Sequence, residues 1–507
     1  MSPTPTPRGN LFARLLSYPC LLTALAATWV CLLVPRSADD PDIWWHLRNA
    51  QAQLAAHAFL RCDSYSFTAK GAPWINHEWL AELPFYLGWR LLGTRGLFLV
   101  TLAAVECIFL GVFYLARRQS GRIQRALLAT VVAAFLSTVS FGPRTLLFGW
   151  VALVAELILL DHLLADDRRP ATRPTAVWLL PLLFGAWVNT HGSWLIGLVL
   201  LLTSVACAWL PLPAGTRGVI DPRNRRRDLT LATALSVAAL FVNPYGWRLV
   251  LYPFNLAFHQ RLNIANIEEW RTLDFHSVRA HVLLLTLALL FLAQLRRPRR
   301  WAPRELAFLF IAVYAAFTYA RFLFLAAILL APILARHIPG LPTSQRHRPG
   351  RNQPWLNAAL LCLLATLAVR HFPSPAEPAP AAHPAFPDTA LPFLTHWQPH
   401  GPLLNEYLWG GYLEWHARQV PIFVDSRVDI FEYSGVFADY LAATRLQNTL
   451  AILDKYRIRY VLFAPDAPLV YLLQHTGGWT TLYHDPSAVL LERGSSAPRP
   501  ATRPANP

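Results

Sequence analysis

The sequence predicts an α-helical polytopic membrane protein of about eleven transmembrane helices, followed by a small extracytoplasmic α/β domain at its carboxy-terminal end. Three observations lead to this fold class. Of the 507 residues, 54% are hydrophobic and only 15% are charged, which is too apolar for an ordinary soluble enzyme of this size. The apolar residues gather in runs long enough to approach a membrane span. The arginines fall in short bursts between these runs.

Eleven apolar runs are the predicted spans, although several are shorter than the about 20 residues that a spanning helix ordinarily needs. They cover residues 17–35, 95–116, 126–141, 146–163, 175–191, 193–211, 229–245, 280–295, 305–319, 321–337 and 355–371. With the amino terminus in the cytoplasm, every arginine burst is cytoplasmic, as the positive-inside rule requires. The carboxy terminus then lies outside. The net charge of +16 therefore reflects topology, because the arginines form no face for nucleic acid.

Composition divides the chain further. The predicted parts are a cytoplasmic tail 1–16, a transmembrane domain 17–371 with outer loops 36–94 and 244–280, a Pro/Ala-rich linker 372–387, a soluble extracytoplasmic domain 388–493 and a disordered tail 494–507. Trp79–Leu92 is apolar but contains charges and a proline, which favours an interfacial helix over a span. In the soluble domain, Val420–Asp425 and Tyr460–Phe463 are predicted strands, and Ala442–Tyr456 is a predicted helix.

The densest polar cluster beside a predicted span runs from Asp39 to Arg48, directly after the first span. Charged groups at a membrane surface are costly, which favours a functional role for them. If Pro41 begins a helix, Asp42 and His46 lie four residues apart on one face, so a carboxylate and a proton carrier can converge on one substrate atom. The alternative is a helix cap with the two tryptophans as interfacial anchors. We favour the functional interpretation.

A second stretch of the first loop places Asp63, His77 and Glu78 among aromatic residues. Aromatic faces beside carboxylates suit a sugar, whose C–H faces stack while its hydroxyls form hydrogen bonds. They suit a membrane interface equally well. The two interpretations carry the same weight here.

Polar residues also recur at the predicted outer ends of the helices: Arg144, Asn189, His191, Asn243, Glu269 and Arg321. An arginine there could bind a lipid phosphate through paired N–H donors. For each residue alone, turn formation or an interhelical hydrogen bond is the commoner explanation, and their shared depth is what favours a site. The sequence has no Gly-rich phosphate loop and no nucleophile elbow, which argues against a nucleotide-driven cytoplasmic mechanism.

These motifs follow one another in a fixed order along the chain. They are Asp40-Pro-Asp-Ile-Trp-Trp-His46, Asp63-Ser-Tyr-Ser-Phe-Thr68, Trp74 to Glu82, Asn189-Thr-His-Gly192, Asn243-Pro-Tyr-Gly-Trp247 and Glu269-Trp270. The set resembles the bacterial polytopic membrane proteins related to the GT-C class of glycosyltransferases, and the resemblance covers most of the chain. Near the carboxy terminus, Asn405 to Trp415 followed by Pro421 to Arg427 is similar to the entry of oligosaccharyltransferases into their soluble domain. Gly410 stands where that motif has its acceptor-reading aspartate, so peptide recognition does not carry over.

The resemblance implies transfer of a sugar from a polyprenyl-phosphate donor to an acceptor outside the bacterial inner membrane, with inversion at the anomeric carbon. Asp42 or Asp40 would be the general base, while His46 and Arg48 would position or neutralise the donor phosphate. The partners would be the polyprenyl-phosphate-linked sugar, membrane lipid, and an acceptor glycan, lipid or protein. No cofactor is predicted, and a divalent metal is left open because members of the class differ in metal use.

Two rival functions stay open. A transporter or flippase would have its critical residues deeper in the membrane, near Glu106 or Glu156. A non-catalytic assembly protein would tolerate loss of the first-loop carboxylates but not of residues 388–493. The candidates for an acceptor or partner surface in that domain are Trp409, Tyr412, Asp425 and Arg427. The alternative for the last two is a satisfied ion pair at a strand end.

Overall fold

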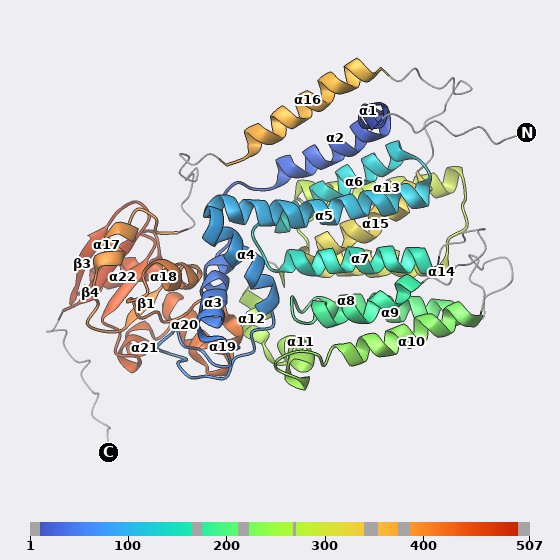
Figure 1. The fold of residues 1–507 in the computed structure, drawn as a ribbon. Coiled ribbons are helices and arrows are strands. Elements are labelled where there is room, and N and C mark those ends of the chain that lie inside the picture. The colour runs from blue at the N-terminus through green and yellow to red at the C-terminus, as the bar shows by residue number, and fades with distance from the viewer. Residues whose placement is uncertain are drawn as a thin grey trace, which may run out of the picture. The chain divides into compact units, whose positions relative to one another are not determined.

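The computed structural model describes residues 11–164, 175–210, 223–266, 270–338, 353–373 and 386–494. The chain divides into two compact units (Figure 1). The first, here called the helical unit, comprises Met1–Ala38, Leu87–Val250 and Ile267–Glu377. The second, here called the mixed unit, comprises Asp39–Tyr86, Leu251–Asn266 and Pro378–Pro507. The mixed unit therefore joins most of the first predicted outer loop, and part of the second, to the carboxy-terminal segment.

Each of the eleven predicted spans overlaps a helix of the helical unit. These helices are α2 (Tyr18–Leu33), α5 (Thr94–Ser120), α6 (Ile123–Ser137), α7 (Leu146–Leu164), α8 (Leu180–Trp187), α9 (Trp194–Trp209), α10 (Arg223–Ala239), α13 (Val278–Arg296), α14 (Pro303–Thr318), α15 (Leu323–His337) and α16 (Pro354–His371). Short helices α1 (Leu11–Leu15), η1 (Thr138–Ser140), η2 (Thr175–Leu179) and η4 (Ala320–Phe322) extend or connect them. Among the described residues, six helices have the length and apolar composition of a span, and three apolar helices are shorter.

Helix α15 lies at the centre of the helical unit and contacts α5, α6 and α14 (Figure 1). Its residues from Leu323 to Ala335 are all buried, because the sequence is apolar on every side of the helix. The Phe324 ring packs parallel to the Phe109 ring of α5, with 5.9 Å between their centroids. This packing without a polar face is expected for the innermost helix of a bundle.

The mixed unit contains a four-stranded sheet with the strand order β1-β2-β4-β3. Its strands are β1 (Leu403–Asn405), β2 (Tyr460–Phe463), β3 (Trp479–His484) and β4 (Val489–Arg493). Strand β1 is parallel to β2, and the other two pairs are antiparallel. Strands β1 and β2 are buried along their length, whereas most of β3 is exposed at the sheet edge. Strand β2 has the bounds predicted from the sequence, so the predicted strand Tyr460–Phe463 is confirmed.

Short helices surround the sheet. The first loop contributes α3 (Asp42–Ala56) and the start of α4 (Trp79–Leu92), and the second contributes α12 (Arg261–Asn266) and most of α11 (Trp247–His259). The carboxy-terminal segment adds α17 (Leu391–His396), η5 (Tyr407–Trp409), α18 (Gly410–His416), α19 (Val428–Tyr433), α20 (Val436–Thr444), α21 (Thr449–Lys455) and α22 (Pro468–Thr476). Helix α4 is not among the helices of span length, in agreement with the sequence prediction.

Two predicted elements of the mixed unit are wrong. Residues 420–425 form no strand, and only Ile422 makes a single bridge, to Ser66. The reason is the side chain of Asn405, which accepts from the Phe423 N–H at 2.8 Å and donates to the Val424 carbonyl at 2.8 Å, replacing ladder hydrogen bonds.

The predicted helix Ala442–Tyr456 is divided into α20 and α21. Between them, Leu446 and Asn448 adopt positive φ angles of 59° and 55°, which end one helix before the next begins. The predicted linker and tail lie largely outside the described residues.

Candidate functional site

The amino-terminal end of α3 carries the first group of candidate residues. The helix begins at Asp42, directly after Pro41, as predicted. The Asp40 side chain accepts a hydrogen bond from the Asp42 backbone N–H at 3.0 Å, so Asp40 caps the helix start. Asp39 is exposed. Of these three carboxylates, Asp42 alone lies within the helix and in register with His46.

Asp42 is half-buried and binds the carboxy-terminal segment. Its Oδ1 accepts a hydrogen bond from Ser426 Oγ at 2.5 Å and a longer one from Trp45 Nε1 at 3.3 Å. Trp45 Nε1 also donates to Ser426 Oγ at 2.9 Å. Ser426 and Trp45 thus hold one carboxylate oxygen in place while the aspartate keeps some exposure. A carboxylate positioned in this way has the geometry of a general base.

Glu82 of α4 holds α3 in place from inside the mixed unit. Its side chain is completely buried and accepts four hydrogen bonds. The donors are His46 Nδ1 at 3.0 Å, Asn49 Nδ2 at 3.1 Å, Gln53 Nε2 at 3.2 Å and Asn76 Nδ2 at 2.9 Å. Because a carboxylate offers about four acceptor positions, this set satisfies it. Glu82 is therefore engaged in structure and is unsuited to act as a base.

His46 is buried between carboxylates. Besides Glu82, it has Glu78 Oε2 at 3.6 Å from its Nε2. Burial by itself lowers the pKa of His46, but the hydrogen bond to Glu82 and the surrounding negative charges outweigh burial and raise the pKa above its usual value. The arrangement favours a positively charged imidazole one helical turn from Asp42. Only 2% of His46 is exposed, so its charge can reach the surface of the unit but its side chain has almost no area for direct contact with a ligand.

The contacts around His46 and Glu78 continue through the second loop to α19. His77 Nε2 lies 3.6 Å from Glu78 Oε1, and the His77 ring packs on Tyr252 at 4.5 Å between centroids. Tyr252 Oη donates to Asp429 Oδ2 at 3.0 Å. Burial raises the pKa of Asp429 to about 6, against the opposing effects of the His77 charge and the tyrosine hydrogen bond. Asp42, Glu78 and Asp429 thus belong to one connected set, here called the acidic array, together with His46, His77, Tyr252 and Ser426.

Asp63 belongs to a separate buried ion cluster. Its Oδ1 accepts from Arg427 Nη2 at 2.7 Å, and Asp425 accepts from Arg427 Nε at 2.9 Å. The guanidinium lies between the rings of Tyr65 and Trp74, 4.9 Å from each centroid. Burial alone would raise the pKa of Asp425, but Arg427 lowers it below its usual value. Asp63 is therefore a structural partner that ties the first loop to the carboxy-terminal segment.

Glu414 completes this cluster, 3.5 Å from Arg427 Nη2. Burial, followed by the nearby charge of Asp425, raises the pKa of Glu414 well above its usual value. The neutral form of Glu414, which this raised pKa favours, adds no further negative charge around Arg427.

The four residues predicted to form an acceptor or partner surface are buried, so that prediction is wrong. Trp409 is 4% exposed, Tyr412 2%, Asp425 0% and Arg427 3%. Tyr412 donates to Asp388 and its ring packs parallel to Phe386 at 4.9 Å. Arg427 and Asp425 can be buried here because opposite charges are paired with each other, a network that the sequence alone does not reveal.

Gly410 leaves no room for a side chain. A Cβ at this position would lie 2.3 Å from the Val424 carbonyl oxygen and 2.6 Å from the Asp425 Cα. Both are backbone atoms that cannot turn aside. An aspartate at this position is therefore incompatible with the packing of α18 in this chain.

The helical-unit candidates are described separately. Asn189 donates to the carbonyls of Gly185 and Val242, and Asn243 closes a turn by accepting from the Tyr245 N–H at 2.8 Å. His191 Nδ1 accepts from the Ser193 N–H at 2.9 Å. These three residues shape the connections between helices, as the commoner explanation predicts.

Two of the candidate arginines lie in the helical unit. The Arg321 guanidinium lies over the Trp270 ring at 4.2 Å, and Arg144 is half-buried in the turn before α7. In the mixed unit, Arg48 Nη1 donates to Gln51 at 3.0 Å. Glu269 lies outside the described residues. Among the described residues, no group of three or more His, Cys, Asp or Glu side chains could hold a metal ion.

Sequence reasoning missed four members of the site: Glu82, Ser426, Tyr252 and Asp429. Glu82 was visible only as a charge interrupting an apolar stretch, and a buried charge in an amphipathic helix is a usable signal. The other three lie far along the chain from the first loop, and no local pattern connects them with Asp42.

Comparison with solved structures identifies similar folds. ArnT from Cupriavidus metallidurans, bound to undecaprenyl phosphate, is similar with a TM-score of 0.56 and 15% identity over 95% of this chain and 99% of that chain. The oligosaccharyltransferase of Archaeoglobus fulgidus gives a TM-score of 0.55 and 12% identity over 90% of this chain and 70% of that chain. Its form tethered to an acceptor peptide with the NVT sequon gives 0.53 and 12%, over 94% and 74%. No protein-family profile and no curated protein sequence matches the chain.

Proposed function

We propose that this polytopic membrane protein, whose fold is that of the GT-C class, is a glycosyltransferase that moves a sugar from a polyprenyl-phosphate donor to an extracytoplasmic acceptor. The observation that carries the proposal is the position of Asp42: a half-exposed carboxylate at the start of α3, held by Ser426 and Trp45, one turn from His46. The mixed unit then lies outside the bacterial inner membrane and the amino terminus lies in the cytoplasm, as the arginine distribution predicts.

Asp42 is the residue best placed to act as the general base. The acceptor hydroxyl attacks the anomeric carbon, its proton passes to Asp42, and the polyprenyl phosphate leaves from the opposite face, so the anomeric configuration inverts. The other carboxylates are engaged elsewhere: Glu82 accepts four hydrogen bonds, and Asp63 is paired with Arg427. Asp40 contributes by capping the helix that carries Asp42.

The leaving phosphate needs fixed positive charge. His46 supplies part of this charge, because its raised pKa favours the protonated imidazole one helical turn from Asp42. Arg48 of the mixed unit is the proposed direct partner of the donor phosphate, since a guanidinium can present two parallel donors to it.

The comparisons support the two substrate classes differently. ArnT was solved with undecaprenyl phosphate, which supports a polyprenyl-phosphate partner for this chain. The archaeal oligosaccharyltransferase was solved with an acceptor peptide. For this chain we propose a glycan, a lipid or a protein without that sequon as the acceptor, because Gly410 has no space for an acceptor-reading side chain.

The test is a sugar-transfer assay with the purified protein, a panel of polyprenyl-phosphate sugars and membrane extract as acceptor. Asp42→Asn should lower the transfer rate by about 10²–10⁴-fold, the usual contribution of a general base. Asp39→Asn is the matched control, because Asp39 is an exposed carboxylate three residues away, and it should retain activity. Asp40→Asn should act only through the helix start. Equal activity of the Asp42 and Asp39 variants would reject the assignment of the base.

One observation favours the transporter alternative. Glu156 in α7 is completely buried, and neither of its carboxylate oxygens has a hydrogen-bond partner among the described residues. Acidic groups inside a helix bundle commonly mark transport pathways. In a transferase, Glu156→Gln should leave sugar transfer intact. A protein that shows no transfer with any donor, but moves a lipid-linked solute across vesicles in a Glu156-dependent way, would be a transporter.

A further inference from the structure

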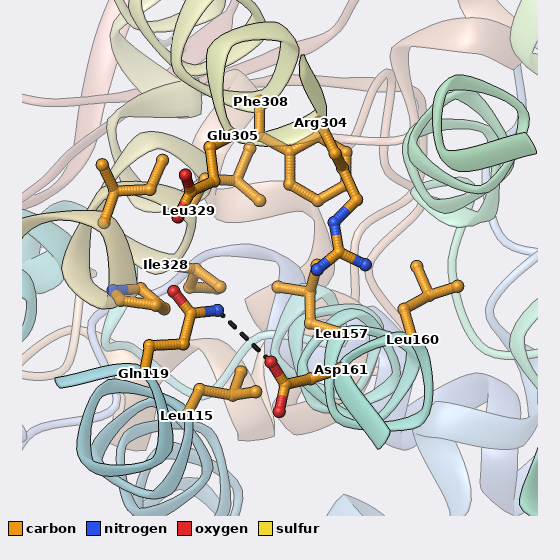
Figure 2. Close-up of a pocket in the computed structure, with 12 residues that line it drawn as sticks. Leu115, Gln119, Leu157, Leu160, Asp161, Arg304, Glu305, Phe308, Ile328 and Leu329 are labelled. Atoms are coloured by element: carbon orange, nitrogen blue, oxygen red, sulfur yellow. Dashed lines mark hydrogen bonds between the residues drawn. The ribbon is translucent and has the colours of Figure 1, made fainter. Parts of the chain in front are cut away.

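A cavity of 40 Å³ lies inside the helical unit, where α5 and α7 end and α14 begins (Figure 2). Its polar lining consists of Gln119, Asp161, Arg304 and Glu305. The rest of the lining is leucine, isoleucine, phenylalanine and proline side chains from α5, α7, α14 and α15. The cavity therefore combines a charged end with apolar walls. Its volume exceeds the roughly 10–15 Å³ that one water molecule needs.

Both carboxylates of this cavity are already neutralised by arginines from neighbouring helices. Asp161 Oδ2 accepts from Arg118 Nε at 2.7 Å. Glu305 Oε1 accepts from Arg336 Nη1 at 2.6 Å, and its Oε2 caps α14 by accepting from the Ala302 N–H at 3.0 Å. The two acids thus have their own partners, and neither depends on Arg304.

Arg304 is the surplus charge. Its guanidinium points into the cavity, between Asp161 and Glu305 (Figure 2). Within the part of the chain that the structure describes, its charge is attracted by Asp161 and Glu305 without a hydrogen bond or an ion pair to either, and the guanidinium lies 5.9 Å from the Phe308 ring centroid. Three arginines face two carboxylates, so the site has one excess positive charge. Arg304 is half-buried, and a charge beside apolar walls is costly unless an anion approaches it.

We propose that this cavity binds a phosphate group, with Arg304 as its main ligand. A guanidinium offers two parallel N–H donors that match two phosphate oxygens. The apolar walls favour a phosphate carried by an anionic lipid, because a free ion gains nothing from them. This site is separate from the acidic array of the mixed unit, and the proposal does not depend on the proposed sugar transfer.

The experiment is a titration of the purified full chain in neutral detergent, followed by calorimetry. The probes are short-chain phosphatidylglycerol, phosphatidylcholine of the same chain length, and inorganic phosphate. Wild type should bind phosphatidylglycerol, and Arg304→Gln should bind it about tenfold more weakly or worse, as expected for loss of a charge-assisted contact. Arg297→Gln, which removes an exposed arginine outside the cavity, is the matched control and should bind like wild type.

A second variant covers the case in which Arg304→Gln fails to fold. Leu157→Phe keeps every charge but fills part of the cavity, and it should also weaken binding. Arg304-dependent binding of inorganic phosphate alone would support the site and identify a free anion as its ligand. The proposal would be overturned if Leu157→Phe still bound phosphatidylglycerol like wild type and Arg304→Gln either did the same or bound no more weakly than Arg297→Gln. It would also be overturned if none of the three probes bound to the wild type.

Discussion

The Glu82 clamp permits a quantitative test of how the mixed unit positions Asp42. Glu82→Gln keeps the size of the side chain but leaves one oxygen in place of two. The amide can then accept from the pair His46 and Asn49 or from the pair Gln53 and Asn76, but not from both. Two buried donors lose their acceptor, at about 1–3 kcal/mol each. The expected loss is about 2–6 kcal/mol, a large part of the stability of an ordinary domain.

Hydrogen exchange of peptides from α3 measures this loss directly, because the amides of the helix exchange when it separates from α4. A loss of 2 kcal/mol corresponds to about thirtyfold faster exchange. Glu492→Gln is the control, because the Glu492–Arg459 pair of 3.0 Å is partly exposed and should contribute no more than about 1 kcal/mol. If α3 exchanges no faster in Glu82→Gln than in Glu492→Gln, the clamp does not hold the helix and our account of the site is wrong.

Two further predictions concern the mixed unit. Asp429 has a folded-state pKa of about 6, above its usual value near 4, so its protonated form favours folding; that contribution is complete below pH ~4 and is lost as the pH rises through ~6. Asp429→Asn should remove this pH-dependent contribution to the free energy of unfolding, which is at most about 3 kcal/mol. The unfolding temperature of the variant should therefore fall less across this window than that of wild type, and an unchanged profile would contradict the assignment. Gly410→Ala should destabilise the unit by about 1–3 kcal/mol because its Cβ meets the Val424 carbonyl. Gly185→Ala, whose nearest atoms are 3.7 Å away, should unfold near the wild-type temperature.

The helical unit was largely predictable from the sequence because its information is local. A span is a run of apolar residues, and each predicted run overlaps a helix. The start of α3 was predictable for the same reason, since Pro41 and its flanking aspartates are adjacent in the chain. Among the described residues, six of these helices reach span length, because several of the apolar runs form shorter helices.

The arrangement of the site was not predictable, because its partners are distant in sequence. Ser426 lies 384 residues from Asp42, and Arg427 lies 364 residues from Asp63. The apolar run that ends at Asp425 favoured a strand, but the Asn405 side chain takes the hydrogen bonds that a neighbouring strand would have supplied. Charged and aromatic residues also favoured a surface where the structure has a buried network, because local sequence does not show which charges neutralise one another.

The joining of the first loop and the carboxy-terminal segment in one unit changes how the rival functions are tested. Deletion of residues 388–493 was expected to distinguish an assembly protein from a transferase. That deletion also removes Ser426, Arg427 and Asp429, which contact Asp42, Asp63 and Tyr252. A transferase would therefore lose activity as surely as an assembly protein would lose its partner. Point substitutions that leave the unit folded distinguish the two, and Asp42→Asn beside Asp39→Asn is the pair that does so with the smallest disturbance of the structure.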